Sequence, residues 1–246
     1  MRPALALLAI VSFTGAAVGA QRPPQTRDIP IDLVCGPVAS LNEPVQSIRV
    51  TGGVERVKTL FAAGEAVVVN AGSAQDLKPG QHFFVRRVIE DRFAVRTTEK
   101  PPRSIHTAGW LTIVETQEHV SIARIAEACD GIIEGDYLEP LIVPPAVVAM
   151  KPGRPDFDHP GRVILADDRR QLGAGGGSLM VIDRGTDHGL RAGQRITLFR
   201  TATGGSGPVV TIGEAFVAST QAESSLIRIE TSSEAVQVGD LVAIHR

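Results

Sequence analysis

The chain reads Val67-Val68-Val69-Asn70-Ala71-Gly72 and then, after a short loop, Leu77-Lys78-Pro79-Gly80-Gln81. Both stretches return 113 positions later, as Val181-Ile182-Asp183-Arg184-Gly185 and Gly189-Leu190-Arg191-Ala192-Gly193-Gln194. A run of β-branched residues that ends at glycine is typical of a strand followed by a turn. Proline and glycine at the second and third turn positions favour a type II turn. The repeat therefore predicts one strand–turn–strand unit in two places.

A second matched set of residues lies downstream in each copy. It runs from Gly109 to Gly135-Asp136 and returns, 104 positions later, from Gly213 to Gly239-Asp240. The shift is nine residues smaller than in the first set, so the first copy carries about nine extra residues in a central arm. Glycine permits the closing turn, and aspartate caps it by bonding nearby backbone. The recurring residues are turn formers and β-formers rather than a set of reactive groups.

These patterns predict an all-β protein with two tandem small β-barrels, of SH3-like or related type, that arose by internal duplication. Five or six short strands joined by glycine turns suit a closed sheet, because closure removes unpaired edges. Five prolines in one short segment block both helix and ladder hydrogen bonds and predict a linker. The predicted order is a signal peptide (1–20), an extended leader (21–47), barrel repeat one (48–142), a proline-rich linker (143–160) and barrel repeat two (161–246).

Composition and charge narrow the classes of partner and compartment. The formal net charge of −2 argues against a nucleic acid or an anionic membrane as partner. The N-terminus has the pattern of a secretory signal, with Arg2, a short apolar run and the small residues Val18-Gly19-Ala20. That run is too short and too interrupted for a spanning helix, and no later segment is apolar enough. We expect a periplasmic or secreted chain without a transmembrane segment after signal cleavage.

Cys35 in the leader and Cys129 near the end of the first repeat are the only cysteines. Two thiols in an oxidising compartment often pair, and a bond here would strap the leader onto the first barrel. Two unrelated buried thiols are the alternative, because the sequence does not reveal the distance between them.

The sequence offers no clear constellation of reactive side chains. The six histidines are scattered without ligand spacing, so we predict no catalytic residue, no cofactor and no metal. Asp187-His188-Gly189 is interpreted as turn chemistry. The glycine run at 173–177 lacks the Lys-Ser or Lys-Thr of a phosphate-binding loop.

Several arginines and a lysine are candidates for contact with a partner. In the penultimate strand of each repeat, Ala123 and Ile125 match Ile227 and Ile229 on one face, so the arginine between them points the other way. Those arginines either support a binding face or form solvated salt bridges. The candidate partner-facing residues are Arg92, Lys100, Arg103, Arg124 and Arg228.

The combined pattern resembles the repeated β-rich region that follows peptidoglycan-binding LysM modules in bacterial envelope proteins. It is also similar to the C-terminal domain of the flagellar assembly protein T family. The residues that carry the resemblance are the two copies quoted above, with Gly135-Asp136 and Gly239-Asp240. The resemblance covers both repeats but not the leader, and it implies no catalytic residues. No LysM sequence is present, so wall binding does not follow from it.

Three functions compete on this basis. The first is a non-enzymatic scaffolding or assembly protein of the cell envelope, which meets an envelope protein through the arm at 89–107 and the loop at 201–208. The second is a module that binds peptidoglycan or another glycan. The third is a secreted hydrolase, which would need a pocket that gathers at least two histidines with a carboxylate.

Overall fold

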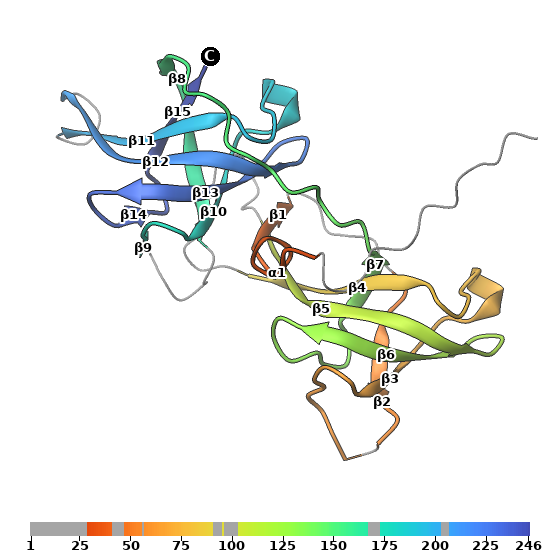
Figure 1. Ribbon diagram of the computed structural model, residues 1–246. Helices are drawn as coiled ribbons and strands as arrows, with labels where there is room; N and C mark the ends of the chain where they lie inside the picture. Colours follow the sequence, from red (N-terminus) through yellow and green to blue (C-terminus); the bar gives the residue numbers. More distant parts are fainter. Residues whose placement is uncertain are drawn as a thin grey trace, which may run out of the picture.

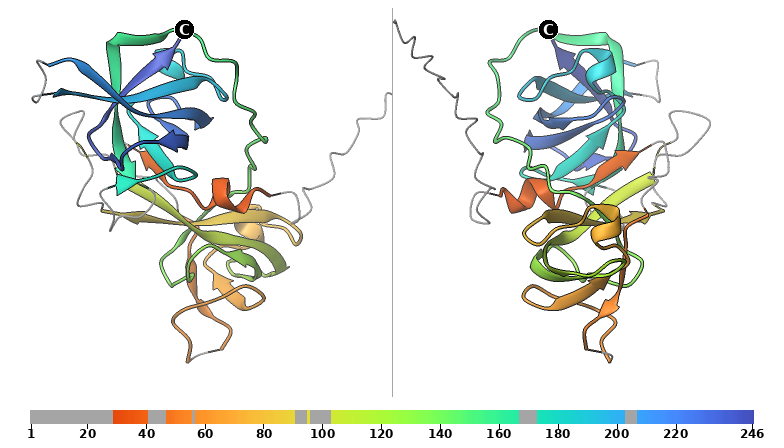
Figure 2. Two further views of the ribbon diagram at one scale, coloured as in Figure 1. Left: turned by 60° about the vertical axis from the view of Figure 1, so that its left-hand side comes forward. Right: turned by 90° about the vertical axis from the view of Figure 1, so that its right-hand side faces the viewer.

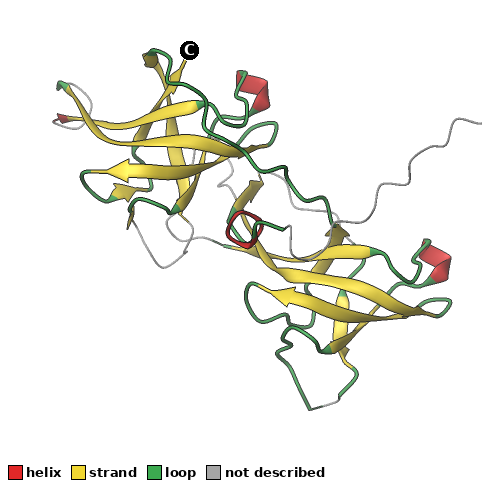
Figure 3. Ribbon diagram, viewed as in Figure 1, coloured by secondary structure: helices red, strands yellow, loops and turns green. Residues whose placement is uncertain are grey.

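The computed structural model describes residues 29–40, 47–55, 57–90, 95, 103–166, 173–202 and 207–246. Within these ranges the protein is all-β apart from single-turn helices (Figure 3). Figure 1 shows two strand-rich halves, with helix α1 (Ile31–Val34) and strand β1 (Val38–Ser40) between them. None of the described helices is long and apolar enough to cross a membrane.

The first half is a seven-stranded antiparallel sheet. Its strand order is β2-β3-β6-β5-β4-β7, and β1 adds to it by pairing with β5. The 3-10 helix η2 (Ser73–Gln75) follows β3. The strands are β2 (Val50–Gly53), β3 (Ala66–Val69), β4 (His82–Ile89), β5 (Arg103–Thr116), β6 (Ser121–Ala128) and β7 (Tyr137–Pro140).

The second half is a closed antiparallel barrel with the order β10-β13-β12-β11-β15-β8. A small two-stranded sheet of β9 (Gly173–Ala174) and β14 (Val236–Gln237) accompanies it, and η3 (Thr186–His188) follows β10. The barrel strands are β8 (Pro155–Ala166), β10 (Leu179–Ile182), β11 (Arg195–Thr201), β12 (Val209–Thr220), β13 (Ser225–Ser232) and β15 (Leu241–His245).

An all-β fold with a closed six-strand barrel is thus confirmed, and the two halves differ in how their sheets end. In the second half, β8 has twelve residues and pairs with both β10 and β15. In the first half, β2 has four residues, and an isolated bridge from Arg49 to Tyr137 connects its start to β7. Two of those four residues, Gly52 and Gly53, add no side chain to the sheet and weaken a strand. Its length is not the reason that β2 has one ladder, because β3 and β10 also have four residues and each pairs with two strands; the two glycines distinguish β2 from them.

Period-2 alternation places the core of each half on the inward face of its strands. Ala123 and Ile125 in β6 and Ile227 and Ile229 in β13 are each at most 1% exposed, which confirms the predicted inward positions. The same alternation in β3 and β10 buries the second and fourth residues in the two cores. Each half therefore has its own hydrophobic core.

The recurring glycines occupy positions that a side chain would disturb. A Cβ on Gly72 would overlap the carbonyl oxygen of Gln117, and one on Gly185 would overlap that of Gln221. These glycines let the loop after β3 or β10 lie directly against the neighbouring hairpin turn. Four predicted turn glycines have φ between 86° and 104°: Gly80 and Gly193, in the turns before β4 and β11, and Gly135 and Gly239, in the turns before β7 and β15.

Two predictions about the connecting segments need correction. The leader is not simply extended, because the carbonyl of Pro30 accepts bonds from the amides of Leu33 and Val34 and starts α1. Proline has no amide hydrogen to lose at the start of a helix. The linker ends before residue 160, since β8 begins at Pro155. Pro155 is the first residue of that strand and Pro160 lies at its irregularity, which are positions where a strand tolerates proline.

Candidate functional site

The leader lies between the two halves and packs against both (Figure 2). On one side, Ile29 and Val34 share a buried cluster with Phe84 and Trp110 of the first half. On the other side, Ala39 belongs to a cluster on the outer surface of the second barrel. The leader thus joins two faces that would otherwise be exposed apolar surface.

A disulfide bond between Cys35 and Cys129 anchors the leader to the first half. The Cα atoms are 5.6 Å apart, although the two residues are separated by 94 positions in the sequence. Both cysteines pack against the cluster that contains Trp110. The bond therefore lies at the junction between the leader and the outer face of the first sheet.

On the second barrel the leader covers the outward residues of β10 and β13. Gly36 approaches so closely that a Cβ there would lie 2.8 Å from Leu179 Cδ1 and 3.3 Å from Leu226 Cδ2. The hydroxyl of Ser224 donates to the carbonyl of Ala39 at 3.5 Å. A glycine in the leader thus allows the bend between α1 and β1 to lie close to this apolar surface.

Where the arm at 89–107 is described, it is not the protruding, solvated element that its composition predicted. The amide of Val95 donates to the carbonyl of Ile164 at 3.2 Å, and its side chain packs on the cluster that the leader covers. The end of the arm forms the start of β5. Hydrophobic contact of Val95 with the barrel explains the difference. Arg92 and Lys100 lie outside the described residues, as do residues 203–206 of the loop at 201–208.

The remaining candidate cations lie on three different strands. Arg103 begins β5, where it is paired with Ser40 of β1. Arg124 on β6 is exposed and donates from Nη1 to the carbonyl of Gly64 at 2.9 Å. Arg228 on β13 is half-buried opposite Leu179. Arg124 and Arg228 point outward as predicted, but they belong to different halves and do not form one site.

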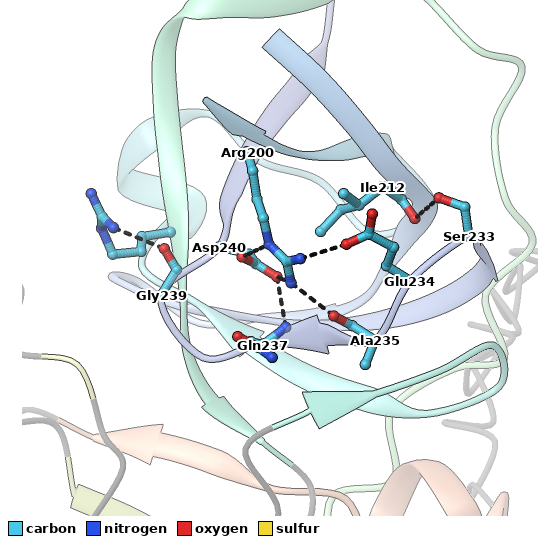
Figure 4. A network of polar contacts seen from close by, with 9 residues as sticks. Arg200, Ile212, Ser233, Glu234, Ala235, Gln237, Gly239 and Asp240 are labelled. Carbon is cyan, nitrogen blue, oxygen red and sulfur yellow. Dashed lines mark hydrogen bonds and ion pairs between the residues drawn. The ribbon is translucent and has the colours of Figure 1, made fainter. Parts of the chain in front are cut away.

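The same arginine–aspartate ion pair occurs in both halves. It connects β4 to the turn before β7 in the first half, and β11 to the turn before β15 in the second. In the second half, Arg200 Nε and Nη2 donate to the two carboxylate oxygens of Asp240 at 2.6 and 2.7 Å (Figure 4). Asp240 also accepts the amide of Gln237 at 2.6 Å, and Arg200 donates to the carbonyl of Ala235 at 2.8 Å. The aspartate is 8% exposed. Bidentate geometry of this kind is the strongest form of such a pair.

The first half contains the same arrangement. Arg87 donates to both oxygens of Asp136 at 2.6 and 2.7 Å, and Asp136 accepts the amide of Ile133 at 2.9 Å. The bond to the aspartate raises the pKa of Arg87, as its counterpart does for Arg200. The predicted backbone cap is present in both halves, whereas the arginine partner was missed. The signal was available, because both members of the pair recur in both copies.

On the outward face of the second barrel, Thr197, Glu214 and His245 form a polar cluster. His245 is 8% exposed, the least of the six histidines. Thr197 Oγ1 lies 2.8 Å from His245 Nε2 and 3.0 Å from Glu214 Oε1. A catalytic triad needs the carboxylate to orient the imidazole through its other nitrogen. Here the carboxylate bonds the hydroxyl instead, and no described group bonds His245 Nδ1. The cluster has the composition of a triad but not its order.

Burial lowers the pKa of His245 below its ordinary value of 6.5, and Glu214 opposes the shift. The unfolded chain therefore takes up a proton at this residue before the folded chain does. We expect the free energy of unfolding to fall as the pH decreases from 6.5 through the lowered pKa, and His245→Gln to remove that part of the dependence. Urea unfolding across pH 5–8 tests this, with His119→Gln on an exposed side chain as the control. An unchanged slope in His245→Gln would contradict it.

A groove of about 290 Å³ lies beside β2 and β3 in the first half. Lys58 spans it by bonding Glu65 and lies 3.6 Å from Glu55. No histidine is among its described lining residues, which are Gly53, Val54, Glu55, Lys58, Phe61, Gly64, Glu65, Ala66 and Arg124. The adjoining loop exposes three aliphatic side chains, namely Val54 (52%), Val57 (95%) and Leu60 (62%).

Comparison with known proteins does not show a family for this chain. No protein-family model matches the chain, and a search of the curated proteins found no significant match.

Proposed function

We propose that the protein is an exported, non-enzymatic scaffolding or assembly module of the cell envelope that works through protein–protein contacts. Its two halves are proposed to descend from one small barrel unit by duplication. The matching strand orders support this, since β2-β3-β6-β5-β4-β7 and β8-β10-β13-β12-β11-β15 correspond element by element. The recurring arginine–aspartate pair supports it as well.

Export is supported by the disulfide. Bonds of this kind persist in oxidising compartments and are rare in the cytosol. The bond between Cys35 and Cys129 uses both cysteines of the chain. The signal-like residues at 1–20 lie outside the described part of the structure.

The single observation that carries the proposal is the loop that exposes Val54, Val57 and Leu60 beside the groove. Clustered aliphatic side chains at a surface are typical of protein contacts. A glycan site instead favours aromatic side chains at the surface. Phe84, Trp110 and Tyr137 are at most 3% exposed, and the one exposed aromatic among the described residues, Phe157 at 36%, lies in the second half, away from the groove. The loop therefore favours a protein partner over peptidoglycan.

Site-specific photocrosslinking in the native host tests the proposal. A photoreactive residue in place of Val57 is expected to yield discrete protein adducts. The same residue in place of the exposed Glu118 is the control, and it should give none. Retention of the purified chain on isolated peptidoglycan, without protein adducts at Val57, would establish the alternative instead.

A further inference from the structure

The two halves have corresponding outer faces, of which one is covered by the leader and the other is accessible. In the second half, the outward residues Val181, Ala218 and Leu226 are 1%, 3% and 5% exposed. They are buried in the cluster that receives Leu33 and Ala39 of the leader. This face of the barrel is therefore built from apolar side chains and covered by Val95 and by the leader, from the last turn of α1 through the bend at Gly36 to the extended β1.

The first half has the corresponding face, formed by Val68, Val114 and Ile122. We call these three residues the β3–β5–β6 face. Val68 pairs with Ile122 across β3 and β6. Val114 lies in β5 where the register with β6 shifts, next to the residue that pairs with Ile122. Val114 is 45% exposed, and Val68 and Ile122 are half-buried. The face thus keeps its apolar character at all three positions while remaining accessible.

Its surroundings extend the apolar surface at both ends. Val120 follows on the turn before β6 and is 39% exposed, where the second half has the serine that bonds the leader. At the other end, Ala66 of β3 borders the groove and lies opposite Arg124. A continuous strip therefore runs from the hairpin turn to the groove.

We propose that the β3–β5–β6 face binds an extended segment of another protein, with small and aliphatic side chains, in the way that Gly36–Ala39 lies on the second barrel. This rests on the proposed function and names the surface and the partner chemistry. A polypeptide segment is favoured because the equivalent face is already occupied by one. Acidic and basic side chains both border the groove, so the central part of the segment is expected to be uncharged.

The two faces differ at one residue, and this difference predicts which side chain a bound segment carries next to it. Ala66 stands where the second half has Leu179, whose Cδ1 would lie 2.8 Å from a Cβ on Gly36 and would have to shift to admit one. The smaller side chain of Ala66 leaves space next to the groove. The bound segment is therefore expected to carry a side chain where the leader has Gly36.

A second copy of this chain is a poorer occupant than another protein. The leader of each copy is bonded to its own Cys129 and pairs with its own β5. Releasing it to bind elsewhere would break those contacts.

The probe is a synthetic peptide with the sequence of residues 33–40 in which Cys35→Ser removes the thiol, together with a second version that also carries Gly36→Val. Each is titrated into the isotope-labelled full mature chain and followed by NMR. We expect saturable chemical-shift changes centred on Val68, Val114 and Ile122, with the Gly36→Val peptide binding at least threefold more tightly.

In the chain, Val114→Asp and Ile122→Asp should each weaken peptide binding at least tenfold. Val209→Asp, on an exposed valine of the second half, is the control and should leave binding unchanged.

Absence of saturable binding, or binding that neither aspartate variant weakens, would overturn the proposal. Concentration-dependent dimerisation that the same variants abolish would identify a second copy as the occupant and would also overturn it. If protein adducts form at Val57 but neither peptide binds, only this inference fails. If the chain binds peptidoglycan and forms no protein adducts, the proposed function fails.

Discussion

Cys35→Ser combined with Cys129→Ser is expected to lower the free energy of unfolding of the first half by about 4–5 kcal/mol. The bond joins residues separated by 94 positions, and the loss of conformational freedom in the unfolded chain grows with the length of the closed loop. Trp110 is the only tryptophan and packs with both cysteines. Its emission is expected to shift to longer wavelength because the leader no longer shields it.

Urea unfolding followed by tryptophan fluorescence measures both effects at once. The second barrel contains no cysteine and is expected to keep its own unfolding transition in far-UV circular dichroism. Reduced wild-type protein should behave like the double variant, and a reductant should not affect the double variant. Equal midpoints and equal emission before and after reduction would show that the bond does not stabilise this junction.

Asp240→Ala is expected to lower the free energy of unfolding of the second barrel by about 3 kcal/mol. The change removes two bonds from Arg200 and the acceptor for the amide of Gln237. Hydrogen bonds to a charged group contribute about 1.5–3 kcal/mol each, and the total loss is reduced because the Arg200 side chain is 31% exposed and can bond water in place of the aspartate. The remaining pair with Glu234 is exposed and compensates little.

Glu234→Ala is the matched control, because it removes only that exposed pair from the same arginine. Its effect should stay within about 0.5 kcal/mol. Adding Arg200→Leu to Asp240→Ala should recover part of the loss, since the guanidinium is then no longer held in a site that lacks its two bonds to Asp240. Urea unfolding followed by circular dichroism distinguishes the three variants. Equal losses in Asp240→Ala and Glu234→Ala would contradict this role for the ion pair.

The repeat in the sequence was sufficient for the inward faces of β6 and β13 and for the glycine turns. Ile125 and Ile229 are buried because alternation along a strand depends only on the strand itself. Gly80 and Gly193 have positive φ because a turn has to be made within a few residues. Such features depend on neighbours along the chain, and neighbours along the chain are what a sequence displays.

Contacts across the molecule required the folded chain. Arg87 and Asp136 are 49 positions apart and meet only because β4 and the turn before β7 are brought together. Whether Cys35 bonds Cys129 depended on a distance that no spacing reveals. The position of the leader likewise depends on two apolar faces in different halves, one that contains Leu179 and one that contains Trp110. Their proximity arises from the packing of residues remote in sequence, and for that reason neither repeat nor composition could establish it.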